Sequence, residues 1–134
     1  MSADFDVAVV GGGLVGSAIA YGLARRGRSV VLLDGGDMDL RASRGNYGLV
    51  WVQGKGKGKP DYTQLSLRSA DLWRDLAADL SAETAQDVGL EQPGGAIVCL
   101  TEEEQEANAA HLAQIKAEQG NRPFEYELLD RAGL

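Results

Sequence analysis

The chain has 134 residues, of which 44% are hydrophobic and 25% charged, and its formal net charge is −7. This balance is typical of one small soluble globular domain and excludes a disordered chain. The negative charge argues against a general nucleic-acid binder, because binding to phosphates needs clustered Lys and Arg.

The first elements expected along the chain are a strand, a glycine turn, a helix and a second strand. An apolar run at residues 7–10 leads into three consecutive glycines, an amphipathic stretch follows over about 14–26, and Gly27 ends it. A second apolar run at residues 30–33 ends on Asp34. This order predicts a parallel β–α–β unit, and therefore an α/β fold of the Rossmann-like kind.

Gly11, Gly13 and Gly16 satisfy the pattern GxGxxG, which is typical of turns that bind a dinucleotide. The first glycine permits a sharp turn, the second lets the pyrophosphate approach the backbone, and the third lets the helix pack close to the sheet. The helix N-terminus offers amide donors to the phosphates, and Asp34 can accept hydrogen bonds from a ribose diol. We interpret this stretch as a dinucleotide site, while the glycines leave the dinucleotide open. An α/β unit that has lost its ligand is the alternative.

A loop rich in Gly, Asp, Ser and Asn spans residues 35–48 and lacks helical or strand periodicity. Ser43, Arg44 and Asn46 are donors that can reach phosphate oxygens or the edge of a heterocycle, and Gly48 permits close approach of the backbone. A solvated surface loop is the alternative interpretation.

A short strand is expected at residues 49–52, and the segment QGKGKGKP follows it. This segment alternates glycine with Lys55, Lys57 and Lys59. We favour a solvated mobile loop here. The second interpretation is a lid, or an electrostatic guide for an anionic substrate.

Two helices and two further strands are expected after this loop. Leucines and a tryptophan at helical spacing predict a helix over residues 61–80, and a capping box at Thr101 starts a helix that runs to about Gln119. The apolar run at 96–100 and the alternation of apolar residues in 124–130 predict strands.

Cys99 and His111 are the single cysteine and the single histidine of the chain. No internal disulfide can form, so we expect a reduced, cytoplasmic setting, and we expect His111 to be a solvated side chain. No spacing typical of metal ligands is present, and no apolar segment approaches the roughly twenty residues that span a bilayer. The start of the chain lacks the features of a signal peptide.

Residues 5–59 and 91–130 resemble the FAD-dependent oxidoreductases of the D-amino-acid oxidase type, which include sarcosine and glycine oxidases and D-amino-acid and opine dehydrogenases. The resemblance rests on VVGGGLVGSAIAYGLARRG, VVLLD, ASRGNYG and QPGGAIVCLTEEE. The run RASRGNYGLVWVQGKG is most similar to the bacterial dehydrogenase branch, some members of which are subunits of hetero-oligomers. Only the N-terminal third of a family member is covered, so we expect a fragment or one subunit of a larger assembly that self-associates in isolation.

The resemblance implies FAD as the cofactor and a small amine or amino acid as the substrate, with hydride transfer to the flavin and hydrolysis of the resulting imine. Residues 1–90 would form the FAD-binding region and 91–134 the start of a substrate-binding region. The family more often has Glu where this chain has Asp34, and a shorter acid still reaches the ribose. The residues implied to bind the cofactor are Gly11, Gly13, Val15, Gly16, Asp34, Ser43, Arg44, Asn46, Gly48 and Leu49.

Two other functions stay open at this stage. One is an NAD-dependent oxidoreductase, although the donor-rich loop after Asp34 suits a flavin better. The other is a noncatalytic truncated or accessory polypeptide that binds nucleotide without turnover. We name no catalytic residue, because the family's substrate-binding positions have no counterparts in this sequence. The substrate, the electron acceptor and the choice between oxidase and dehydrogenase also stay open.

Overall fold

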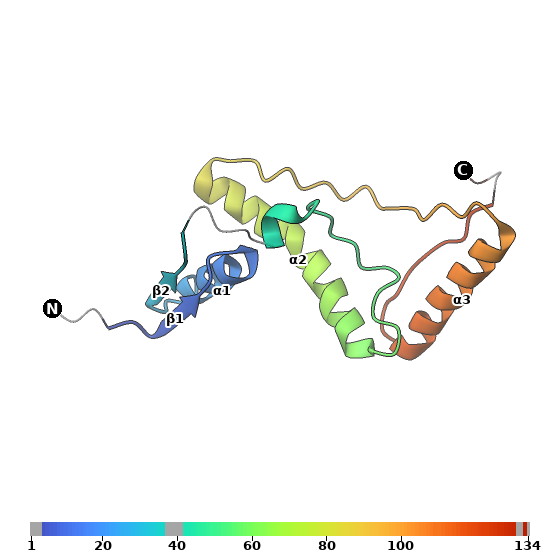
Figure 1. The fold of residues 1–134 in the computed structure, drawn as a ribbon, viewed down its shortest axis with the longest axis horizontal. Coiled ribbons are helices and arrows are strands. Elements are labelled where there is room, and N and C mark those ends of the chain that lie inside the picture. The colour runs from blue at the N-terminus through green and yellow to red at the C-terminus, as the bar shows by residue number, and fades with distance from the viewer. Residues whose placement is uncertain (1–3, 37–41, 131–132, 134) are drawn as a thin grey trace. The chain divides into compact units, whose positions relative to one another are not determined.

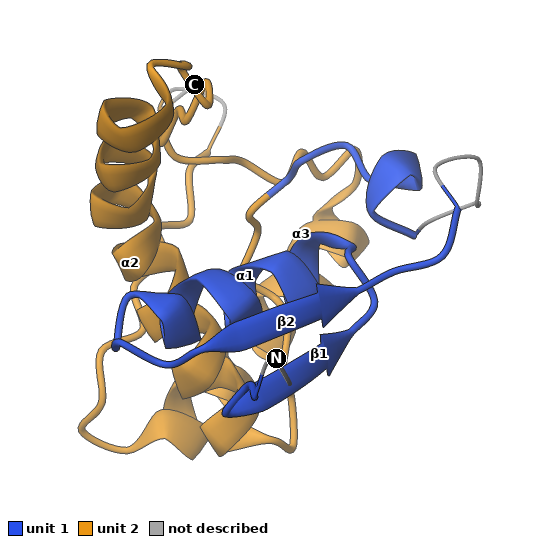
Figure 2. Ribbon diagram, turned by 90° about the vertical axis from the view of Figure 1, so that its left-hand side faces the viewer, with its two compact units in different colours: residues 1–49 blue, residues 50–134 orange. Residues whose placement is uncertain are grey.

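The computed structural model of the chain describes residues 4–36, 42–130 and 133 (Figure 1). These residues form two compact units, residues 1–49 and 50–134, which we call unit 1 and unit 2 (Figure 2). Unit 1 holds both strands of the described chain, and unit 2 holds its two longest helices. Each unit is described by itself below.

Unit 1 is the predicted β–α–β unit. Strand β1 (Val7–Val10) pairs in parallel with β2 (Val30–Leu33), and Val7 lies opposite Val30 in the register. Helix α1 (Leu14–Ala24) connects the strands and packs against both (Figure 2). Parallel neighbours need a crossover of this length, which a helix supplies. The predicted α/β class is therefore confirmed.

Helix α1 ends two residues before the predicted end at residue 26. The reason lies in Gly27, whose positive φ of 74° turns the chain out of the helix. The amides of Arg26 and Arg28 both donate to the carbonyl oxygen of Leu23, at 3.0 and 3.2 Å, which closes the last turn. The chain then enters β2.

The described part of the loop after β2 is more regular than predicted. Ala42–Gly45 forms a short 3-10 helix, η1, although its sequence has no helical periodicity. The Asn46 side chain then accepts a hydrogen bond from the amide of Gly48 at 2.8 Å, and Gly48 has a φ of 74°. Local side-chain bonds of this kind order a turn that periodicity does not reveal.

Unit 2 contains the two predicted long helices. Helix α2 (Pro60–Thr84) runs one turn past the predicted end at residue 80, and α3 (Glu102–Gln119) ends where predicted. The Thr101 half of the predicted capping box is confirmed at the start of α3, where its hydroxyl accepts from the amide of Glu104 at 3.1 Å. The Glu104 carboxylate in turn accepts from the amide of Leu100 at 2.7 Å.

The core of unit 2 is built on one face of α3, the face that carries Leu112 and Ile115. Ile115 is 0% exposed and Phe124 3% exposed, and Leu112 completes the buried cluster, against which Leu67 and Tyr126 pack. The ring of Tyr126 meets that of Phe124 edge to face, with 6.1 Å between centroids. The apolar side chains of 124–126 therefore cover helix α3.

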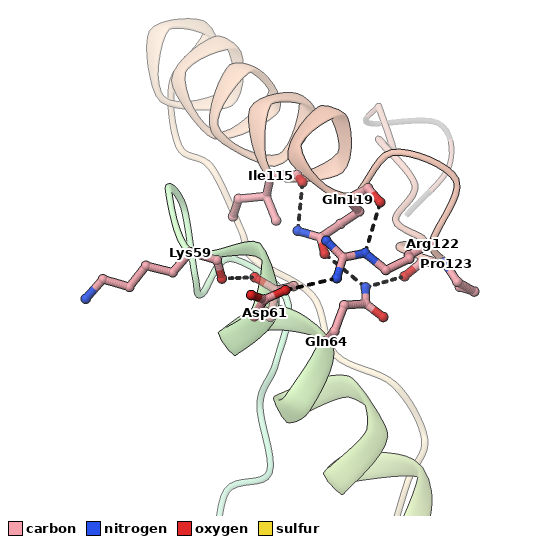
Figure 3. Close-up of polar contacts among 8 residues, drawn as sticks. Lys59, Asp61, Gln64, Ile115, Gln119, Arg122 and Pro123 are labelled. Atoms are coloured by element: carbon pink, nitrogen blue, oxygen red, sulfur yellow. Dashed lines mark hydrogen bonds and ion pairs between the residues drawn. The ribbon is translucent and has the colours of Figure 1, made fainter.

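Polar contacts join the start of α2 to the end of α3 (Figure 3). Arg122 forms an ion pair with Asp61 at 3.3 Å, and the Gln64 amide donates to the Gln119 side chain at 2.9 Å. Gln119 is buried and donates to the carbonyl oxygen of Ile115 at 3.1 Å. The buried amide is thus satisfied, as burial of a polar group requires.

Three predicted strands are wrong. Residues 49–52, 96–100 and 124–130 form no strand in the structure. Within the described ranges, the sheet consists of β1 and β2, so these segments have no strand to pair with. The alternation in 124–130 instead reflects packing of Phe124 and Tyr126 against the core of unit 2.

Candidate dinucleotide site

The glycine turn between β1 and α1 is shaped by two of its glycines. Gly11 has a φ of 102°, which L side chains rarely adopt, and its amide donates to the carbonyl oxygen of Leu33 at 2.7 Å. A methyl group on Gly16 would overlap the carbonyl oxygen of Gly11 and lie 3.5 Å from a methyl of Val9. Both glycines therefore allow the helix to begin close to the end of β1.

Gly13 is the N-cap of α1 and faces open space. A methyl group added there would meet only the Ser43 hydroxyl, at 3.6 Å. No side chain caps the helix, and its first turn carries no acid. The amides at the start of a helix lack intrahelical partners and carry partial positive charge, so this end suits an anion.

Gly12 is constrained by Asp34, a contact that the pattern GxGxxG does not predict. A methyl group on Gly12 would lie 2.5 Å from a carboxylate oxygen of Asp34 and 2.9 Å from its carboxyl carbon. The other carboxylate oxygen accepts from the amide of Gly35 at 2.9 Å. The end of β2 therefore places the acid against the middle glycine of the turn.

Two adjoining open clefts lie over this turn, with volumes of about 330 and 530 Å³. The smaller is lined by the start of α1 together with Ser43 and Arg44 of η1. The larger carries more apolar surface, including Val10 and Val15, which are 83% and 75% exposed. A ligand with an anionic part and a flat apolar part would complement the pair of clefts.

The structure brings most of the predicted cofactor residues together. Asp34 adjoins the clefts through Gly12, whereas Gly48 and Leu49 lie outside the cleft lining. Leu49 is exposed, and Gly48 is involved in the turn closed by Asn46. The predicted residues that line the clefts are Gly11, Gly13, Val15, Gly16, Ser43, Arg44 and Asn46.

Several lining residues were not predicted from the sequence. Ser17 lies one turn into α1 and its hydroxyl donates to the carbonyl oxygen of Gly12 at 3.3 Å. Gly12 also lines the smaller cleft, and its place inside the run of three glycines was a usable signal, as helical spacing from Gly13 was for Ser17. The others contribute apolar surface, namely Val9, Val10, Leu14, Ile19 and Ala42.

The arrangement fits a dinucleotide on three structural observations. The N-terminus of α1 has no side-chain cap, and Gly13 leaves a space there that a side chain would fill. The carboxylate of Asp34 lies against the turn at Gly12. Among the residues that the structure describes, no group of three or more His, Cys, Asp or Glu could hold a metal ion. None of the described helices is long and apolar enough to cross a membrane.

The single cysteine and histidine belong to unit 2. The Asn108 amide lies 3.4 Å from the sulfur of the half-buried Cys99. His111 is half-buried and its Nε2 lies 2.9 Å from the carbonyl oxygen of Gly54. The expectation of a fully solvated histidine is therefore wrong, and its partner comes from the glycine–lysine segment.

Comparison with known proteins gives one family. The family model described as FAD dependent oxidoreductase (DAO) matches residues 6–134. The B subunit of the opine oxidase of Agrobacterium tumefaciens (strain Ach5) is 48% identical over 128 residues, which are 96% of this chain and 34% of that protein. The corresponding B subunit of the Rhizobium meliloti opine oxidase is 47% identical over 128 residues, with the same coverage.

Glycine oxidase of Geobacillus kaustophilus (strain HTA426) is also similar. It is 36% identical over 104 residues, which are 78% of this chain and 28% of that protein. No solved structure matches the chain at a significant level. The chain spans about a third of the length of the curated relatives it matches.

Proposed function

This chain belongs to the family of FAD-dependent oxidoreductases, and on that premise we propose that unit 1 holds FAD for the oxidation of an amine or amino acid. The observation that carries the proposal is the uncapped N-terminus of α1, which opens beside Ser43 and Arg44. The names of the relatives, glycine oxidase and opine oxidase, support a CH–NH donor as substrate.

The glycine turn is proposed to bind the pyrophosphate. The backbone at Gly11, Gly13, Val15 and Gly16 would hold the phosphates at the positive end of α1, and Asp34 would accept hydrogen bonds from the adenosine ribose. An open approach at Gly13 and a fixed carboxylate beside Gly12 support these two roles.

The segment after β2 is proposed to continue the site towards the flavin. Ser43 and Arg44 would face the pyrophosphate and the flavin side, and Asn46, Gly48 and Leu49 would lie near the isoalloxazine. The larger cleft supports the roles of Ser43 and Asn46, which line it together with the exposed apolar start of α1, whereas Gly48 and Leu49 are carried over from the resemblance alone. Bound FAD would supply an acceptor for the hydride that leaves the carbon beside the amine nitrogen.

The further organisation is also part of the proposal. Residues 1–90 would bind the cofactor, and residues 91–134 would begin the substrate-binding region. This division by function differs from the two compact units, which meet at residues 49 and 50. The two opine oxidase relatives are named as subunits, which supports a place in a hetero-oligomer. This chain's own part in the reaction would be to bind and orient the cofactor, and we assign it no catalytic residue.

An absorbance spectrum of the purified protein tests the proposal, followed by release and chromatography of any bound cofactor. We expect flavin bands and FAD in the extract, with reduction of the flavin by an amine or amino acid under anaerobic conditions. A yellow protein that no amine reduces would favour the noncatalytic alternative. A colourless protein that takes up NAD and not FAD would overturn the proposal.

The carboxylate of Asp34 should matter for adenosine binding. Changing Asp34 to alanine removes a charged hydrogen-bond acceptor, and such bonds contribute about 1.5–3 kcal/mol, so we expect the Kd for FAD to rise roughly ten- to hundredfold. Asp34→Asn keeps the size of the side chain and one acceptor oxygen. Its Kd for FAD should lie between those of the wild type and Asp34→Ala. Fluorescence titration of the flavin-free protein measures this, and equal affinity in all three proteins would exclude Asp34 from the site.

A further inference from the structure

Ser17 adds a hydroxyl group to the open end of helix α1. It lies one turn after Gly13, and its backbone amide donates to the carbonyl oxygen of Gly13 at 2.9 Å. The side chain is exposed and lines the smaller cleft together with Ser43 and Arg44. The residues that line this cleft all belong to unit 1.

The side chain of Ser17 points back towards the glycine turn. The Cα–Cβ bonds of an α-helix tilt towards its N-terminus, and the Ser17 hydroxyl reaches the carbonyl oxygen of Gly12, five residues earlier, at 3.3 Å. Gly12 directly precedes the N-cap, Gly13. The hydroxyl therefore lies beside the start of the helix, where the backbone amides have no side-chain cap.

The hydrogen bond between Ser17 and Gly12 is long, which leaves the hydroxyl available to a better acceptor. Bonds between a hydroxyl and an oxygen are usually about 2.5–3.0 Å long, and a bond of 3.3 Å between exposed groups contributes little. A charged acceptor gives a shorter bond that is about twice as strong. Gly12 lines the same open cleft, so water can replace the hydroxyl at its carbonyl oxygen.

A second hydroxyl approaches the helix start from η1. A methyl group added to Gly13 would lie 3.6 Å from the hydroxyl oxygen of Ser43. Ser43 therefore borders the space in front of Gly13 from one side, and Ser17 borders it from the helix. Arg44 lines the same cleft and adds a positive charge. Two hydroxyl donors and a guanidinium group at a helix start complement a pyrophosphate, which carries two negative charges.

We propose that Ser17 is a cofactor-binding residue, whose hydroxyl leaves the carbonyl oxygen of Gly12 and donates to a phosphate oxygen of FAD. The inference rests on the proposed function and adds a side-chain contact to the backbone contacts of the glycine turn. The pyrophosphate is then held by hydroxyls from two elements, Ser17 of α1 and Ser43 of η1. No covalent bond changes, and the proton stays on the serine oxygen.

A purely structural role for Ser17 would have different consequences. A hydroxyl that served only to fix Gly12 would stabilise the flavin-free protein, and its loss would disturb the adjoining contact between Gly12 and Asp34. Because the bond is long and exposed, and because alanine is the better helix former, we expect the flavin-free Ser17→Ala protein to unfold at the wild-type temperature or slightly above it. Adenosine has the ribose and no phosphate, so its binding reports whether the Asp34 side of the turn is intact.

The test compares ligands with and without phosphate. The complete enzyme, with any partner subunit, is freed of flavin and titrated calorimetrically with FAD, ADP and adenosine. In Ser17→Ala we expect the Kd for FAD and the Kd for ADP each to rise about tenfold, as for a bond to a charged group in an open cleft, and the Kd for adenosine to stay unchanged. Ser17→Thr keeps the hydroxyl and should keep the wild-type affinity for all three ligands.

Ser69 of α2 provides a matched control. It is also an exposed serine within a helix, and its hydroxyl donates to the carbonyl oxygen of Leu65 at 2.7 Å. Ser69 lines neither cleft. Ser69→Ala removes the same kind of local bond, and it should leave the Kd for all three ligands at the wild-type value.

The outcomes separate the inference from the proposed function. Weaker adenosine binding or a lower unfolding temperature in Ser17→Ala, or no recovery of ADP affinity in Ser17→Thr, would assign Ser17 a structural role and overturn the inference. Unchanged FAD and ADP binding in Ser17→Ala would also overturn it and leave the proposed function intact. Should the wild type bind ADP and no flavin, the proposed function fails, and the ADP titrations of the variants decide whether Ser17 contacts phosphate. A wild type that binds neither would overturn both.

Discussion

Replacing Gly16 with alanine is expected to abolish FAD binding and to lower the free energy of unfolding by about 3 kcal/mol, at the upper end for overpacking. The added methyl group would overlap the carbonyl oxygen of Gly11, a backbone atom that cannot rotate away. Relief requires α1 to move away from the end of β1, and that movement opens the turn proposed to hold the pyrophosphate. Flavin content and chemical denaturation of the purified variant measure both effects.

Gly22 provides a matched control on the same helix. A methyl group added there would have only the terminal nitrogen of Arg26 nearby, at 3.9 Å. Alanine is favoured over glycine inside a helix by about 1 kcal/mol, so Gly22→Ala should stabilise the protein and leave flavin content unchanged. Wild-type flavin content in Gly16→Ala would show that the close approach of the helix start to Gly11 is not needed for binding.

Replacing Gly13 with aspartate is expected to separate stability from binding. Gly13 has extended backbone angles that any residue adopts, and aspartate there would cap α1 and interact favourably with its dipole. We expect the flavin-free protein to gain about 0.5–1 kcal/mol. The same carboxylate would occupy the position proposed for the pyrophosphate, and like charges at close range should raise the Kd for FAD at least about a hundredfold.

Gly13→Asn distinguishes charge from bulk. Asparagine has nearly the same size and also caps a helix, but it carries no charge. FAD titration and thermal unfolding of the two flavin-free variants are compared side by side. A larger loss of affinity with aspartate than with asparagine is expected from repulsion, whereas equal losses would mean that filling the space beside Ser43 is sufficient. Undiminished binding in both would contradict a phosphate at this helix start.

The elements of unit 1 could be predicted because their causes are local. The bounds of β1 and β2 follow from apolar runs with glycine or an acid beside them, and both are confirmed to the residue. The start of α1 follows from the glycine turn. Helix α3 was equally predictable, since the capping box at Thr101 and the glycine at its end are both local features.

The wrong strands fail for a nonlocal reason. An apolar run indicates that the side chains of a segment become buried, but it does not identify the element that buries them. At residues 124–130 the partner is α3, whose buried Ile115 and Leu112 receive Phe124. At 96–100 the side chains of Ile97, Val98 and Leu100 are exposed, and no described strand pairs with the segment.

The candidate site was predictable to the extent that its chemistry lies in a short motif. The glycine pattern and the donors at Ser43, Arg44 and Asn46 gather at the clefts, whereas Gly48 and Leu49 do not line them. The sequence predicted the parallel pairing of the strands but not the crowding of Gly12 by Asp34, because the crowding depends on the exact register and on the conformation of the Asp34 side chain. Only the parallel pairing of β1 and β2 brings them together.

That crowding has an evolutionary consequence. A side chain at position 12 would contact the Cβ and Cγ atoms of the residue at position 34. Aspartate and glutamate both have these two atoms, so either acid would crowd it. Positions 12 and 34 should therefore covary across homologous sequences. A side chain at position 12 would require either rotation of the acid at position 34 or its replacement by a smaller residue. Homologues that lack an acid at position 34 should therefore carry a side chain at position 12 more often than those that keep it.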